Sequence, residues 1–135
     1  YRLLEFPENA GKYRSVSGVP TAEFITSPGR TDHDRLFIVE GSFKAMVLCV
    51  FLEKHGYGNS QVIGLPGITS KLYRNHAYDY PEVFVMLDPD GPTHTRRVAR
   101  EINAKPIFMP SKIDDAIVSG LSWDSFVSII ENSGL

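Results

Sequence analysis

Three carboxylates follow directly on apolar runs of this sequence. Asp88 and Asp90 end the stretch "VFVMLDPD", and Glu40 ends the run "RLFIVE". Two aspartates separated by one residue repel each other unless a positive charge lies between them. Carboxylate oxygens are hard ligands, and one or two of them suit magnesium. The spacing therefore predicts that Asp88 and Asp90 hold Mg²⁺, with Mn²⁺ as an alternative.

An alternation of strands and helices is predicted to position these acids. Apolar runs predict strands at 35–41, 60–67, 82–88 and 105–110, and helices are expected at 42–56, 69–79, 92–104 and 122–134. The strands are uniformly apolar, which favours a mainly parallel sheet with helices on both faces. The predicted fold class is α/β, a Rossmann-like sheet of four strands. We expect the helix at 42–56 to be well buried, including Phe43, Met46 and Val50.

Ligands of such sheets bind at the carboxyl ends of the strands. If the strand with Glu40 lies beside the strand with Asp88, the glutamate faces the same crevice as the two aspartates. There it can assist a metal or move a proton. A single acid in such a place often only caps the next helix, but three converging acids favour the metal site.

Size and composition limit the organisation of the chain. With 135 residues, of which 42% are hydrophobic, it can bury one ordinary core. We expect residues 1–31 to form an extended arm or hairpin packed on the sheet, and residues 32–135 to form the catalytic domain. The chain begins with Tyr1 instead of methionine, as we expect of a domain from a larger protein.

Other patterns narrow the function classes. The only cysteine, Cys49, cannot form an internal disulfide, and no apolar run is long enough to span a bilayer, so we expect a cytoplasmic protein without membrane contact. The four histidines lack the spacing of a helical zinc site, and the sequence contains no P-loop.

Basic residues gather after the aspartates although the net charge of the chain is -2. Residues 94–112 contain five basic residues and only one acidic residue, a local excess that suits a phosphate backbone. Arg97 and Arg100 share a helix face there, and the alternative is an ordinary solvated surface. Lys44, early in the predicted helix 42–56, either contacts a phosphate as a point charge or is likewise solvated.

Two longer stretches resemble a known family. "LFIVEGSFKAMVL" and "VFVMLDPDGPTHTRRVAREI", with Asp88 placed 48 residues after Glu40, are similar to the Toprim domain of primases, topoisomerases and OLD-family nucleases. The hallmarks are a strand ending in Glu-Gly and a later strand ending in Asp-x-Asp. "VIGLPGITS" and "MPSKIDDAIVSG" are similar to segments of primases fused to helicases in phages and mobile elements. The resemblance covers roughly residues 32–120 and implies a Toprim-like fold.

The resemblance also implies roles for individual residues. Glu40 would act as general acid or base in nucleotidyl transfer, and Asp88 and Asp90 would hold Mg²⁺. Asp114, and less directly Asp115, would approach the metal, and Glu40 itself is a further candidate ligand. Lys112 beside them joins Lys44, Arg97 and Arg100 as a candidate for binding phosphate or nucleic acid. The implied partners are single-stranded DNA, nucleoside triphosphates and a helicase domain of the parent protein.

Three alternatives remain open beside a primase. A Toprim or OLD-type nuclease would use the same acids, and a scaffold would bind metal and nucleotide without turnover. The stretch "FVMLDPDGPT" also resembles haloacid-dehalogenase-like phosphatases, in which the first aspartate is the nucleophile. Only 45 residues follow Asp90, which disfavours that reading. Gly91 to His94 stand where many Toprim sequences have a further acid, which disfavours topoisomerase chemistry.

Overall fold

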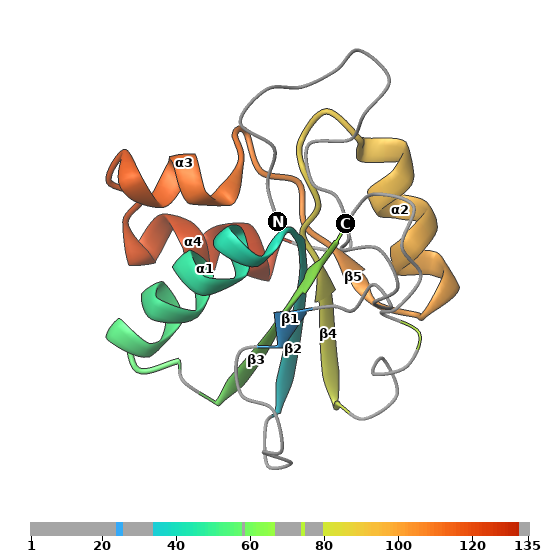
Figure 1. Cartoon of the computed structure of the whole chain (residues 1–135), viewed down its shortest axis with the longest axis horizontal. Helices are drawn as coiled ribbons and strands as arrows, with labels where there is room; N and C mark the ends of the chain where they lie inside the picture. Colours follow the sequence, from blue (N-terminus) through green and yellow to red (C-terminus); the bar gives the residue numbers. More distant parts are fainter. Residues whose placement is uncertain (1–23, 26–33, 58, 67–73, 75–79, 133–135) are drawn as a thin grey trace, which may run out of the picture.

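The sheet has five strands in the order β1-β3-β2-β4-β5. The computed structural model describes residues 24–25, 34–57, 59–66, 74 and 80–132. In these residues β2 (Arg35–Glu40), β3 (Ser60–Leu65), β4 (Glu82–Val85) and β5 (Lys105–Pro106) are parallel, and β1 (Phe24–Ile25) is antiparallel to β3 (Figure 1). The predicted α/β class with four parallel strands is therefore confirmed.

Helices cover both faces of this sheet. In Figure 1, α1 (Ser42–Lys54), α3 (Ile113–Val118) and α4 (Trp123–Glu131) lie on one side, and α2 (Pro92–Glu101) lies on the other. Successive side chains of a strand point to opposite faces, so β2 divides between two cores. Phe37 and Val39 are buried with residues of α1 and α4, whereas Leu36 and Ile38 are buried with residues of α2. Among the described residues, none of the helices has the length and apolarity needed to cross a membrane.

The order of the strands creates a switch point in the middle of the sheet. From β2 the chain passes through α1 to β3 on one side, and it then returns to β4 on the other side of β2. The chain leaves β2 toward α1 on one face of the sheet and β4 toward α2 on the other face, and ligands of open α/β sheets usually bind at the carboxyl ends of two such strands. The pairing of β2 with β4 places the predicted acids at this switch point. Arg35 pairs with Glu82 and Ile38 with Val85, the last residue of β4, and β2 continues for two more residues to Glu40, so Glu40 lies beside the segment that leads from β4 to Asp88.

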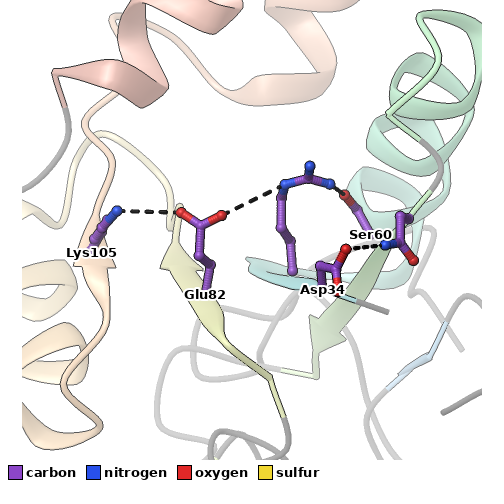
Figure 2. A network of polar contacts seen from close by, with 6 residues as sticks. Asp34, Ser60, Glu82 and Lys105 are labelled. Atoms are coloured by element: carbon purple, nitrogen blue, oxygen red, sulfur yellow. Dashed lines mark hydrogen bonds and ion pairs between the residues drawn. The ribbon is translucent and has the colours of Figure 1, made fainter. Parts of the chain in front are cut away.

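The opposite end of the sheet is held by a polar network (Figure 2). Arg35, the first residue of β2, lies 3.8 Å from Glu82 of β4 and 3.4 Å from Ser60 of β3. Glu82 in turn lies 3.4 Å from Lys105 of β5. Exposed ion pairs of this kind each stabilise a fold by at most about 1 kcal/mol. The network links the first residues of four neighbouring strands. A strand shifted in register would lose these contacts, so the network favours the observed register.

Several element boundaries differ from the prediction. The predicted strand 105–110 is regular only over Lys105–Pro106, and the predicted helix 92–104 ends at Glu101. The short helix α3 was not predicted. The predicted helix 69–79 lies outside the described residues except for Arg74, which forms an ion pair with Glu101 of α2. Of the predicted arm or hairpin at 1–31, the structure describes only β1, which lies at the edge of the sheet.

The prediction that α1 is well buried was wrong for one of its faces. Phe43, Met46 and Val50 are 58%, 52% and 65% exposed, whereas Ala45 and Leu48 are fully buried. Residues three and four apart lie on the same side of a helix, so the exposed residues form one stripe and the buried residues another. Both stripes are apolar, and for this reason the sequence carries no periodicity that identifies the buried one.

Candidate functional site at the carboxyl end of the sheet

Glu40 is held by a tight turn between β2 and α1. Gly41 has a φ of 85°, in the region that residues with a side chain rarely adopt, and its N–H donates to the Leu65 carbonyl at 2.7 Å. A Cβ on Gly64 of β3 would lie only 2.5 Å from the Gly41 carbonyl oxygen. The two glycines therefore allow the strand, the turn and the first residues of α1 to approach closely, and this approach sets the position of Glu40.

Asp88 and Asp90 occupy the turn between β4 and α2. Met86 still pairs with β2, its N–H donating to Ile38 at 2.9 Å, and the turn then closes through the Gly91 N–H and the Asp88 carbonyl at 3.1 Å. Pro92 is the first residue of α2, where the missing N–H is tolerated and φ is already helical. The aspartates thus stand between the end of a buried strand and the beginning of a helix.

The structure brings Glu40 next to this turn. The backbone N–H of Asp88 donates a hydrogen bond to the Glu40 carboxylate, and the charges of Asp88 and Asp90 both act on Glu40. Burial raises the pKa of Glu40 above its ordinary value of 4.5, and the Asp88 carboxylate raises it further. The hydrogen bond from Asp88 and the charge of Lys44 act in the opposite direction. The result is a half-buried carboxyl group that is a better proton acceptor than an ordinary glutamate.

Two lysines converge on the Asp88 carboxylate. The Lys44 ammonium lies 3.0 Å from Oδ1 and 3.1 Å from Oδ2 of Asp88, and both side chains are largely buried, at 16% and 15% exposed. The Lys112 ammonium, at the start of α3, lies 4.0 Å from Oδ2. Lys44 is in the first turn of α1. The beginnings of α1 and α3 therefore both direct a positive charge to the aspartate at the end of β4.

The donors of this site suit a hard divalent cation. The described residues contain no group of three or more acidic, histidine or cysteine side chains at metal-binding distances. Mg²⁺ does not need such a group, because proteins usually bind it through one or two carboxylates with water and substrate phosphates. The Asp88 carboxylate already binds one cation, the Lys44 ammonium. Glu40 supplies a second carboxylate beside it. The residues present therefore fit Mg²⁺.

The remaining predicted site residues differ in burial and in their distance from Asp88 along the chain elements. Asp90 is exposed in the turn, and Asp114 lies in the first turn of α3 with a buried Oδ1 that has no hydrogen-bond partner in the described structure. Arg97 contacts the ring of His94 in the first turn of α2. Arg100, at the last turn, is about 12 Å from the start of α2 along its axis. Arg100 is thus the predicted phosphate-binding residue that lies farthest along α2 from the turn.

The contact of Lys44 with Asp88 was not foreseen from the sequence. The two residues are 44 positions apart, and the sequence suggested only a phosphate or solvent as the partner of Lys44. His94 is a second unforeseen feature, because its Nε2 is buried without a hydrogen-bond partner among the described residues. Its position four residues after Asp90 is the only signal that the sequence offers for it.

The raised pKa of Glu40 predicts how stability depends on pH. An unfolded glutamate ionises near 4.5, whereas folded Glu40 holds its proton to a higher pH. Stability is therefore lost as the pH rises from the unfolded value through the raised pKa. We expect Glu40→Gln, which cannot ionise, to be more stable than the wild type at pH 7 and to match it near pH 4. Urea unfolding at the two pH values, with EDTA present, measures this difference.

A matched control separates this effect from a change in net charge. Glu131→Gln removes one negative charge at an exposed position at the end of α4. The stability of Glu40→Gln relative to the wild type should rise between pH 4 and pH 7. This rise should be larger than the rise for Glu131→Gln. An equal gain in both variants would mean that burial and Asp88 do not act on Glu40.

Comparisons with known proteins support the fold. No protein-family model matches the chain, and no curated protein matches it. The crystal structure of a DNA primase domain from Pseudomonas aeruginosa is similar over 76% of this chain, with a TM-score of 0.54 and 19% sequence identity. The chain spans about a third, 34%, of the length of that structure. At this identity the similarity establishes a primase-like fold.

Proposed function

We propose that this chain is a Toprim-type catalytic domain that supports Mg²⁺-dependent primer synthesis on single-stranded DNA. The observation that carries the proposal is the hydrogen bond from the Asp88 N–H to the Glu40 carboxylate at the switch point of the sheet, with Asp90 two residues further along the same turn. The Glu-Gly and Asp-x-Asp sequences that resemble Toprim motifs supply those acids. The fold similarity to a primase domain agrees with this assignment.

The reaction would join the 3′ hydroxyl of a growing primer to the α-phosphorus of a nucleoside triphosphate and release pyrophosphate. Asp88 and Asp90 would hold Mg²⁺, which when bound stabilises negative charge on the phosphoryl oxygens. Glu40 would accept the proton of the attacking hydroxyl, a role that its raised pKa supports. Asp114 is the further candidate ligand from α3.

The surroundings of the acids suit the phosphates of the substrate. Lys44 and Lys112 bring two ammonium groups to the same edge of the sheet. The helices α1 and α2 both begin there without a side-chain cap, so their first N–H groups remain available to an anion. Arg97 reaches back to the first turn of α2, where it can add a bidentate contact with a phosphate or with single-stranded DNA.

Primer synthesis by the complete protein tests the proposal. With Mg²⁺, nucleoside triphosphates and a single-stranded template, we expect Glu40→Gln to lower the initial rate by about 10²-fold, the usual contribution of a general acid or base. The same variant should be at least as stable as the wild type at neutral pH, so that unfolding does not explain the loss. Wild-type synthesis by Glu40→Gln would overturn the mechanism. Nicking of DNA without nucleotides would instead assign the site to a nuclease.

A further inference from the structure

The contact between Lys44 and Asp88 has a consequence for metal binding. The ammonium lies at nearly equal distances, 3.0 and 3.1 Å, from the two carboxylate oxygens, in a largely buried place. A divalent cation on the same carboxylate would be strongly repelled by this ammonium, because two positive charges at such a separation are poorly screened away from bulk water. Lys44 and a metal ion therefore compete for Asp88.

The Lys44 ammonium also has a second possible partner, a phosphate group at the start of α1. It is the third residue of α1, whose first turn carries no acidic side chain and no side-chain cap. A phosphate group near this helix end would meet free N–H groups and the positive end of the helix dipole. The lysine side chain is a flexible stem with a compact charge, so the same ammonium can turn from Asp88 to a phosphate oxygen.

We propose that Lys44 couples metal binding to triphosphate binding in this domain, an inference that rests on the proposed function. Without a triphosphate, the Lys44 ammonium occupies Asp88 and excludes the divalent cation. When a nucleoside triphosphate binds, the ammonium moves to its phosphates and releases Asp88, while phosphate oxygens complete the coordination of the metal. The domain therefore holds metal weakly until the substrate is present.

Lys112 does not duplicate this role. Its ammonium is at 4.0 Å from one oxygen of Asp88 only, and its side chain is 42% exposed. A pair of this geometry in contact with solvent is weak. Replacing Lys44 alone therefore removes the main competitor and leaves a solvated charge nearby.

The test uses one substitution, Lys44→Met, and two separate binding measurements on the complete protein. The first is Mn²⁺ affinity without nucleotide, followed by the electron paramagnetic resonance of free Mn²⁺. We expect Lys44→Met to bind Mn²⁺ about tenfold tighter than the wild type, because the competing charge is gone. The second is the affinity for a non-hydrolysable nucleoside triphosphate in EDTA, which we expect to fall about tenfold because a phosphate contact is lost.

Opposite changes in the two affinities are the signature of the proposal. A lysine that only supports the fold would weaken both when replaced, and a solvated lysine would change neither. Lys54→Met is the matched control, since it removes the same charge from an exposed position at the other end of α1. Unchanged or weaker Mn²⁺ binding by Lys44→Met would overturn the coupling.

Asp88→Asn distinguishes the two proposals. If the wild type binds Mn²⁺, Asp88→Asn abolishes that binding and Lys44→Met leaves it unchanged, the metal site of the proposed function stands and only the coupling fails. If neither the wild type nor Lys44→Met binds Mn²⁺, with or without the triphosphate, both proposals fail together.

Discussion

Replacing Asp88 with asparagine is expected to lower the rate of primer synthesis by the complete protein by about 10³-fold, as is typical when a group that stabilises charge in the transition state is removed. Asparagine has nearly the same shape but no negative charge, so it binds a divalent cation far more weakly. In the wild type the Lys44 and Lys112 ammonium groups lie 3.0 and 4.0 Å from the Asp88 carboxylate, and the substitution leaves both without this anionic partner. Initial rates at saturating Mg²⁺ measure this loss.

Asp124→Asn is the control for Asp88→Asn. Asp124 lies in the first turn of α4, a helix that is capped by Ser122 and begins away from the carboxyl ends of the strands. The control should retain the wild-type rate. If Asp88→Asn remains within tenfold of the wild type, Asp88 does not hold the metal that the reaction uses.

Replacing Phe126 with alanine is expected to destabilise the fold by about 3–5 kcal/mol, the usual range for a buried phenylalanine. Phe126 is the fully buried residue of α4, and its ring lies 5.3 Å from that of Phe51, 5.6 Å from Trp123 and 6.3 Å from Phe37. Its removal leaves a cavity at the point where α4 meets α1 and the centre of the sheet. Equilibrium unfolding in urea measures the loss.

Phe43→Ala is the comparison for Phe126→Ala. The chemical change is the same, but Phe43 is 58% exposed on α1, and surface substitutions usually change stability by no more than about 0.5 kcal/mol. Similar losses in the two variants would show that α4 does not pack on the sheet as described.

The sequence predicted the α/β fold and the end of the sheet at which Glu40 and Asp88 lie beside each other. The runs around Phe37 and Phe84 are buried on both faces, and a strand of that kind is apolar throughout and short enough to recognise. The helix α3 was missed because Ile113–Val118 has only six residues, too few for a helical period to appear. Gly64 continues β3, and its lack of a side chain makes room for Gly41.

The contacts inside the site were less accessible to sequence reasoning. That Glu40 and Asp88 approach each other follows from the pairing of β2 with β4, which general rules for parallel sheets anticipate. That Lys44 turns toward Asp88 depends on the angle at which α1 leaves Gly41, and this angle is set by contacts with β3. Such packing is not encoded in any local pattern of residue types.

The pairing of β2 with β4 also bears on how this protein can change during evolution. Glu40 and Asp88 are aligned by backbone hydrogen bonds between two adjacent strands, and not by the length of chain that separates them. The entropy of closing a loop grows only slowly with its length. Insertions or deletions between β3 and β4 should therefore leave both acids in place, so that lineages can diverge in this connection while keeping the same chemistry.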